Sequence, residues 1–182
     1  SMIQMKPYVK VELTFIALDS NGLLSQANNG EIRERMEKTI EMEAPIRRSL
    51  LYKRVINSFG LVKVGSRISP LFDSIAQALD YPTTEDSDGE TVFHNGKEED
   101  FFRPSPDPED RYSYQIPSSE AASCLIYIIS SSDKNSMTKS QLYRDFIKTM
   151  GWEKSGGAIE KLFSSALSDP RIKRSGNGRF IK

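Results

Sequence analysis

The chain has 182 residues, of which 37% are hydrophobic and 27% charged, and its 25 basic and 25 acidic side chains cancel. This composition is typical of a soluble globular protein and excludes a disordered chain, and no apolar run approaches the roughly 20 residues that span a bilayer. The N-terminus lacks the basic-then-apolar pattern of a signal peptide. The single cysteine, Cys124, cannot form an internal disulfide and favours a cytoplasmic protein. Because His94 is the only histidine, we expect no zinc site, and no other metal or cofactor.

Residues 1–27 hold one predicted element, a half-buried strand over residues 8–17, where apolar and polar side chains alternate. We interpret residues 1–27 as a lead-in to the helices that follow. The first helix is predicted after Asn28, which resembles a capping box together with Glu31. Its buried face, repeated every four residues, consists of Ile32, Met36 and Ile40.

Two glycines separate the second and third predicted helices. A helix whose apolar residues recur at spacing four ends at Gly60, because glycine adopts the left-handed conformation of a helix stop at little cost. A further helical pattern begins after Gly65, and Pro70 fits its first position if Ser69 is the cap. The apolar positions of the two helices are Leu51, Val55, Phe59, Ile68, Leu71, Phe72, Ile75 and Leu79.

The second half of the chain has the same series of three helices. Ser118 or Ser119 is predicted to cap the first helix, with Glu120 in its first turn. Gly151 follows the second helix and Gly156 precedes the third. The apolar positions of these helices are Ala121, Leu125, Ile128, Ile129, Leu142, Phe146, Met150, Ile159, Leu162, Phe163 and Ala166.

Each series ends in a predicted β-hairpin, because an Asn-Gly pair between alternating segments is a strong hairpin signal. The segments and turns are residues 171–174 and 179–182 around Asn177-Gly178, and residues 91–94 and 100–103 around Asn95-Gly96 and the acidic insertion Glu98-Glu99-Asp100.

Residues 46–78 align without a gap on residues 137–169, at an offset of 91. The matched positions are Leu51 with Leu142, Tyr52 with Tyr143, Ile56 with Ile147, Gly60 with Gly151, Gly65 with Gly156, Ile68 with Ile159, Leu71 with Leu162 and Phe72 with Phe163. Chance similarity between two amphipathic helix pairs is the alternative to a repeat. Three helices followed by a hairpin is the winged-helix arrangement. The sequence therefore predicts an α+β, mainly helical protein of two tandem winged-helix units, residues 28–115 and 116–182, related by an internal repeat.

Four segments of the first half carry a family resemblance. They are Glu43-Ala44-Pro45-Ile46, Leu51-Tyr52-Lys53-Arg54-Val55, Phe59-Gly60-Leu61 and Gly65-Ser66-Arg67-Ile68. Together they resemble a bacterial domain of unknown function that lies at the C-terminal end of large superfamily 1 helicase-like proteins. This chain departs from the family pattern at Leu61, where an aromatic residue is common.

The resemblance implies a parent chain with helicase-type ATPase motifs and a nuclease-like domain upstream. The 182 residues contain no phosphate-binding loop of the Gly-x-x-x-x-Gly-Lys-Ser/Thr type. We therefore expect the chain itself to be a non-catalytic accessory module. Tyr52 and Tyr143 are interpreted as packing residues of matching helices, His94 as a turn residue and Cys124 as a core residue.

Two functions remain open for such a module. The first is DNA binding, in which the third helix of a winged helix enters the major groove and the wing touches the backbone. Charge favours the second unit, because residues 116–182 carry 11 basic and 6 acidic residues whereas residues 83–115 carry 3 and 10. The candidate contacts are Lys154, Ser155, Lys161, Lys173, Arg174, Asn177 and Arg179 in the second unit, and Lys63, Ser66 and Arg67 in the first.

The second function is a protein-interaction or architectural module. Such a module would position the parent protein's motor and nuclease domains or recruit a protein partner. The acidic, proline-bearing segment of residues 83–110 suits a linker or a docking surface.

Overall fold

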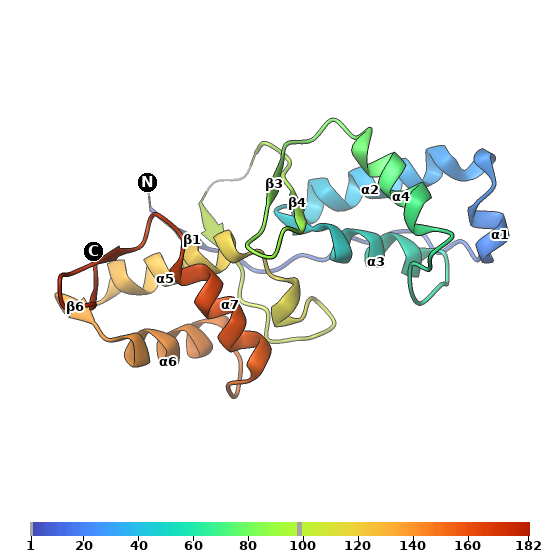
Figure 1. Ribbon diagram of the computed structural model, residues 1–182. Coiled ribbons are helices and arrows are strands. Elements are labelled where there is room, and N and C mark those ends of the chain that lie inside the picture. Colours follow the sequence, from blue (N-terminus) through green and yellow to red (C-terminus); the bar gives the residue numbers. More distant parts are fainter. Residues whose placement is uncertain (1, 98–99) are drawn as a thin grey trace. The chain divides into compact units, whose positions relative to one another are not determined.

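The computed structural model describes residues 2–97 and 100–182 (Figure 1). These residues form an α+β fold with seven α-helices and three small sheets. The chain divides into two compact units: an N-terminal unit of Val9–Glu85 with Glu90–Lys97, and a C-terminal unit of Ser1–Tyr8, Asp86–Gly89 and Glu98–Lys182. Residues 100–115, which we expected in the first unit, therefore group with the second. No helix within the described ranges is long and apolar enough to cross a membrane.

The N-terminal unit contains four helices and a three-stranded sheet. Its elements are α1 (Ser20–Leu23), the 3-10 helix η1 (Gln26–Asn28), α2 (Asn29–Glu43), β2 (Ile46–Arg47), α3 (Arg48–Ser58), α4 (Ser69–Gln77), β3 (Thr83–Glu85) and β4 (Thr91–Phe93). The strands are antiparallel in the order β2-β4-β3, with Ile46 opposite Phe93. Both of these side chains are buried in one core with the apolar faces of α2, α3 and α4.

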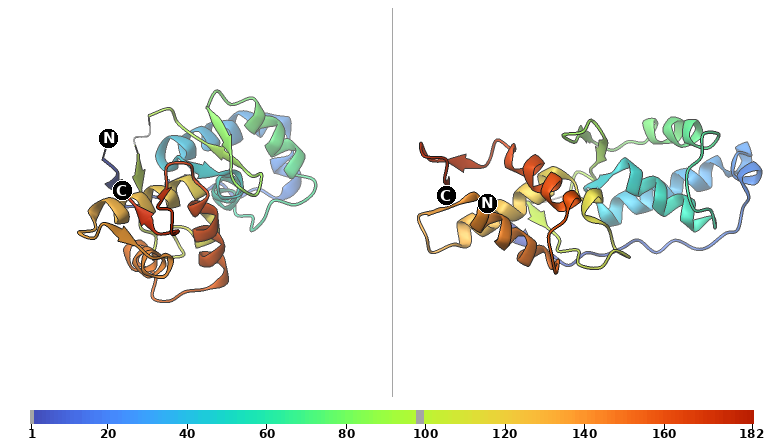
Figure 2. Two further views of the ribbon diagram at one scale, coloured as in Figure 1. Left: turned by 60° about the vertical axis from the view of Figure 1, so that its left-hand side comes forward. Right: turned by 60° about the horizontal axis from the view of Figure 1, so that its bottom comes forward.

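The C-terminal unit contains three helices, a three-stranded sheet and a short parallel strand pair. Its elements are β1 (Gln4–Met5), β5 (Phe101–Phe102), the 3-10 helix η2 (Ser113–Gln115), α5 (Ser118–Ser131), β6 (Ser136–Met137), α6 (Lys139–Met150), α7 (Gly157–Leu167), β7 (Lys173–Arg174) and β8 (Phe180–Ile181). The antiparallel sheet has the order β6-β8-β7, with Met137 opposite Phe180. These two side chains are buried with the apolar faces of α5, α6 and α7. The hairpin of β7 and β8, dark red in Figure 2, lies at the periphery of this unit.

The glycines that follow α3 and α6 have the backbone conformation predicted for them. Gly60 follows α3 with φ +80°, and Gly151 follows α6 with φ +87°. A Cβ atom at Gly151 would lie 3.1 Å from the Cβ of Pro106, so the position is restricted in space as well as in backbone angle.

Several predicted helix caps are wrong in detail. Asn28 precedes α2, but its side chain makes no capping hydrogen bond; its amide nitrogen donates instead to the Gly22 carbonyl at 2.7 Å. Ser118 is the first residue of α5 rather than its cap, and Ser69 is likewise the first residue of α4. Pro70 stands in the first turn of α4, where its missing N–H costs no intrahelical bond.

The predicted first hairpin is wrong in its partner strand. β4 pairs with β3 instead of residues 100–103, and β5 pairs in parallel with β1. Asp88-Gly89, with Gly89 at φ +86°, lies between β3 and β4 and is the turn signal that the sequence prediction missed. Of the acidic insertion, Glu98 and Glu99 lie outside the described residues. The acidic segment of residues 83–110 is also no simple linker, because Arg103 and Ser105 within it and Arg111 directly after it are buried.

Residues 8–17 do not form the predicted strand. This segment is irregular chain. The Ile16 N–H donates a hydrogen bond to the Ser58 carbonyl, and the N–H of Leu18, directly after the segment, donates to the Phe59 carbonyl. The Val11 N–H donates to the carboxylate of Glu43 at 3.0 Å. Val9 and Phe15 are exposed, so the alternation of apolar and polar residues does not correspond to an alternation of buried and exposed side chains.

Candidate nucleic-acid interface

The predicted contact residues of the α6–α7 region lie on the surface of the C-terminal unit. Ile159, Leu162 and Phe163 turn one face of α7 into the core, which leaves Lys161 exposed on the opposite face. Lys154 and Ser155 are exposed in the turn before α7, where the Ser155 hydroxyl hydrogen-bonds with the Tyr143 hydroxyl.

A groove of about 300 Å³ lies between α6 and α7 in this unit. It is lined by Lys139, Ser140, Tyr143, Glu160, Phe163 and Ser164. Thr138 and Gln141 form a reciprocal capping box that starts α6, so Lys139 and Ser140 stand in its exposed first turn. Sequence analysis missed both residues, although the Thr-x-x-Gln pattern of the capping box signals this helix start.

Of the predicted contact residues in the β7–β8 hairpin, two are exposed and two make hydrogen bonds within the fold. Lys173 and Arg174 are exposed, and the Arg174 guanidinium lies 4.8 Å from the centroid of the Phe180 ring. Arg179 is half-buried, and its Nε donates to the Ser136 hydroxyl at 2.6 Å, tying β8 to β6. Asn177 accepts a hydrogen bond from the Ser175 hydroxyl within the turn between β7 and β8. Arg179 and Asn177 are therefore partly used by the fold itself.

The exposed cations of this surface are not neutralised by carboxylates. Among the described residues, Lys154, Lys161, Lys173 and Arg174 form no salt bridge. Glu160, beside Lys161 on α7, is the one acidic residue among the groove-lining residues. The turn before α7, α7 itself and the β7–β8 hairpin thus each present an unneutralised positive charge, which is what contact with a polyanion requires.

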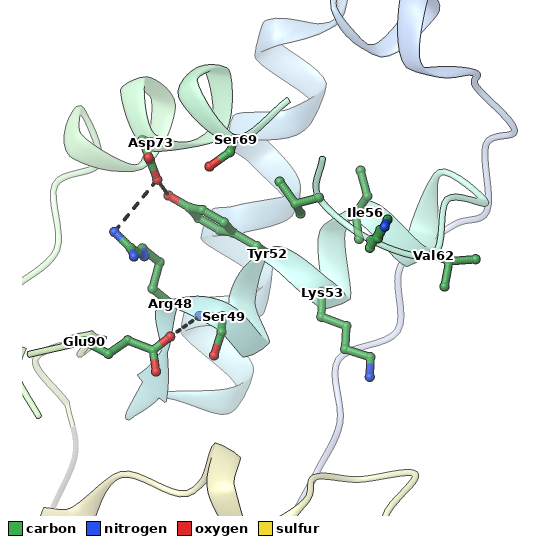
Figure 3. Close-up of a pocket in the computed structure, with 11 residues that line it drawn as sticks. Arg48, Ser49, Tyr52, Lys53, Ile56, Val62, Ser69, Asp73 and Glu90 are labelled. Carbon is green, nitrogen blue, oxygen red and sulfur yellow. Dashed lines mark hydrogen bonds and ion pairs between the residues drawn. The ribbon is translucent and has the colours of Figure 1, made fainter. Parts of the chain in front are cut away.

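In the N-terminal unit the structure brings only one of the three predicted residues into a groove. Lys63 lines a hollow of about 400 Å³ between α3 and α4 (Figure 3). Ser66 and Arg67 are exposed but are not among its lining residues, and Arg67 donates to the Asn21 side chain at 2.9 Å. The full lining is Arg48, Ser49, Tyr52, Lys53, Ile56, Val62, Lys63, Val64, Ser69, Asp73 and Glu90.

The two carboxylates of this groove already have partners. Asp73 accepts a hydrogen bond from the Tyr52 hydroxyl at 2.6 Å and lies 3.9 Å from Arg48 (Figure 3). Glu90 accepts from the backbone N–H of Ser49 at 2.9 Å and forms an ion pair with Arg47 at 2.5 Å. Burial, together with the bond to Asp73, raises the pKa of Tyr52 above its usual range, so its hydroxyl stays protonated.

Other residues singled out in the sequence have structural contacts. The Tyr52 ring meets Phe72 at a centroid distance of 5.3 Å, and Tyr143 meets Phe163 at 4.8 Å. His94 hydrogen-bonds through Nε2 with the Thr84 hydroxyl at 2.8 Å. Burial raises the pKa of Cys124 above its usual range. No three metal-ligating side chains converge within residues 2–97 and 100–182.

Comparison with known proteins yields one family match. No curated protein and no solved structure matches the chain. The model of a family described as "Protein of unknown function (DUF3320)" matches residues 22–70, which span α2, α3 and the first residues of α4. This part of the N-terminal unit is therefore similar to a domain of unknown function.

Proposed function

We propose that the chain is a non-catalytic nucleic-acid-binding module of two winged-helix units, which contacts DNA mainly through the C-terminal unit. The order of elements supports this architecture: helix, strand, helix, helix and hairpin follow each other in α2-β2-α3-α4-β3-β4 and in α5-β6-α6-α7-β7-β8. The strand between the first two helices joins the hairpin in both sheets, next to the hairpin's second strand. This is the arrangement of a helix-turn-helix fold with a wing.

Matching contacts support descent of both units from one repeat. Tyr52 and Phe72 touch in one unit, and Tyr143 and Phe163, each 91 positions later, touch in the other. Gly60 and Gly151 share the same position and the same left-handed conformation. A repeat of this kind places the third helix and the wing of each unit on equivalent surfaces.

The observation that carries the proposed function is the set of unneutralised cations in the C-terminal unit. Lys154 precedes the third helix, Lys161 lies on its exposed face, and Lys173 lies in the wing. Winged helices bring these same three parts to the DNA. The resemblance to the C-terminal domain of helicase-like proteins fits this role, because an accessory module of that kind would hold the substrate of an upstream motor.

Salt-dependent binding to duplex DNA tests the proposal. We expect a fluorescein-labelled duplex of mixed sequence to bind weakly, with fluorescence anisotropy as the measurement between about 50 and 200 mM salt. Lys154→Ala/Lys161→Ala/Lys173→Ala should weaken binding and lower the salt slope by about 0.9 for each lost phosphate contact. Lys38→Ala/Lys97→Ala, which removes exposed lysines of the N-terminal unit that are paired with Glu34 and Glu41, serves as the control. Absence of binding by the wild-type chain at low salt would contradict the proposal.

The choice of residues follows from the structure. Arg179→Ala would also break the hydrogen bond to Ser136, so a loss of binding in that variant would not separate contact from folding. Circular dichroism of the triple lysine variant checks that the fold is intact, because all three side chains are exposed.

Exposed apolar side chains favour a second candidate function, a protein-interaction or architectural module. Phe15 is 66% exposed, Met42 51% and Val62 86%, all in the N-terminal unit. Such a surface suits the upstream domains of a parent chain or a protein partner. Phe15→Ser/Met42→Ser, at two exposed residues outside the lining of the groove between α3 and α4, would then weaken binding to the upstream domains and leave DNA affinity unchanged.

A further inference from the structure

The grooves of the two units occupy equivalent positions in the repeat proposed above. The residue pairs that line both grooves, each 91 positions apart, are Arg48 with Lys139, Ser49 with Ser140, Tyr52 with Tyr143, Ser69 with Glu160 and Asp73 with Ser164. Lys63 in the first groove corresponds to Lys154, in the turn before α7. Each unit therefore has a hollow between two helices, α3 and α4 in one unit and α6 and α7 in the other. A cation lies at the start of α3 and of α6, and another lies in the turn that follows each of these helices.

Packing explains why the core positions match, but it does not explain the matched cations. Arg48, Lys63, Lys139 and Lys154 are all exposed, and long charged side chains on the surface are rarely required by a fold. Neighbouring exposed positions have diverged freely: Val62, for example, corresponds to Glu153. Retention of positive charge at two exposed positions in both units points to a common negatively charged ligand.

The ligand would meet side chains rather than the open end of a helix. In the N-terminal unit the backbone N–H of Ser49 is taken by Glu90, and in the C-terminal unit that of Gln141 is taken by Thr138. The hydroxyls of Ser49 and Ser140 and the cations beside them remain at the exposed rim of each groove. Cations and hydroxyls are the groups that contact phosphate and sugar oxygens in protein–nucleic acid complexes.

We propose that each groove binds the phosphate backbone of a nucleic acid, so that the N-terminal unit has a backbone site of its own. This inference rests on the proposed function and extends it from the C-terminal unit to both. It also assigns Arg48, Ser49, Lys139 and Ser140 to the interface in addition to Lys63 and Lys154. In the N-terminal groove Asp73 is held by the Tyr52 hydroxyl and lies 3.9 Å from Arg48, and Glu90 is held by the Ser49 N–H. Among the described residues, Lys63 has no carboxylate partner and presents its charge to the ligand.

A site-resolved titration tests each groove separately. The probe is a 12-base-pair duplex of mixed sequence, followed by amide chemical shifts of the isotope-labelled chain in two-dimensional NMR. We expect amides near Ser49 and Lys63 to shift together with those near Ser140 and Lys154. In Arg48→Gln/Lys63→Gln the shifts near Ser49 should be lost while those near Ser140 persist, and Lys139→Gln/Lys154→Gln should have the opposite effect.

Controls and outcomes separate this inference from the proposed function. Lys38→Gln removes an exposed lysine of α2 that is paired with Glu34. The amide shift changes that DNA causes near Ser49, Lys63, Ser140 and Lys154 should be the same in this variant as in the wild type. If DNA shifts only amides of the C-terminal unit, the proposed function stands and the N-terminal site is refuted. If no amide shifts at low salt, both fail. If polyglutamate shifts the amides near Ser49 and Lys63 while DNA does not, the groove recognises an acidic protein and the inference is overturned.

Discussion

Replacing Glu120 by glutamine should destabilise the C-terminal unit strongly. The Glu120 carboxylate is buried and accepts hydrogen bonds from two buried guanidiniums, at 2.7 Å from Arg103 and 2.6 Å from Arg111. Arg111 also donates through Nε to the Ser105 hydroxyl at 2.8 Å, so its position is held on more than one side. Glu120→Gln keeps the size of the side chain but leaves two buried positive charges without their counter-ion.

The size of the effect follows from the burial of all three groups. Removal of one partner from a buried ion pair costs about 3–5 kcal/mol, because the remaining charge has lost its water as well as its counter-ion. Burial by itself would raise the pKa of Glu120, but the charges of Arg103 and Arg111 outweigh it and lower that pKa to about 2. The difference from an ordinary value of 4.5 corresponds to roughly 3 kcal/mol, which agrees with the first figure.

The lowered pKa of Glu120 also determines how the stability of the C-terminal unit depends on pH. A carboxyl whose pKa is lowered by folding contributes its full stability above the unfolded-state pKa, and this stability is lost as the pH falls through the folded-state value. The wild-type C-terminal unit should therefore lose stability between about pH 4.5 and pH 2 through Glu120. Glu120→Gln should lack this contribution over that range.

Urea unfolding followed by tryptophan fluorescence measures the stability of the C-terminal unit, in which Glu120 lies. Trp152 is the only tryptophan, and it packs against Phe146 of the C-terminal core at a ring distance of 5.5 Å. We expect the unfolding midpoint at neutral pH to fall by more than about 1 M in Glu120→Gln. Glu160→Gln, which alters an exposed glutamate of α7, should unfold like the wild type. An unchanged midpoint in Glu120→Gln would refute the argument that this carboxylate compensates the buried arginines.

Two further substitutions test the packing of the same unit. Gly151→Ala should lower the free energy of unfolding by about 1–2 kcal/mol, because the residue has φ +87° and its new Cβ would press on Pro106. Gly157→Ala, at the open first position of α7, should leave the free energy of unfolding unchanged. Thermal melting compares the two variants. Tyr8→Ala should lower the urea midpoint, because the ring lies over both buried guanidiniums at 4.8 and 4.5 Å, whereas Tyr8→Phe, which keeps the ring, should retain most of the stability.

Local sequence patterns were sufficient to predict the long helices and the β7–β8 hairpin. The apolar spacing of α3 and α6 and the glycines after them depend on residues within one or two turns of each other, so they are visible along the chain. The same holds for the C-terminal hairpin, where Gly178 adopts φ +79° between β7 and β8. Of the candidate contacts, Lys154, Lys161 and Lys173 are exposed on the unit in which the sequence placed them.

Long-range partners could not be predicted in the same way. The strands have two or three residues each, which is too short for an alternating pattern to identify a partner, so β4 was assigned to the wrong neighbour and β1 was not foreseen. The grooves between α3 and α4 and between α6 and α7 could not be predicted either, because their lining residues come from different helices. Arg48 and Asp73 approach only when α3 packs against α4.

The sequence by itself thus determined which segments are helical, where α3 and α6 end, which faces are apolar and where positive charge accumulates, because these properties depend on near neighbours. Only the tertiary structure decided which charges face water. Arg103 and Arg111 lie in a stretch whose composition is that of an acidic linker, yet both are buried around Glu120. The residue type of a charged side chain does not show whether the charge is solvated or is buried beside a counter-ion. The cost of burying the charge depends on partners that only folding brings within hydrogen-bonding distance.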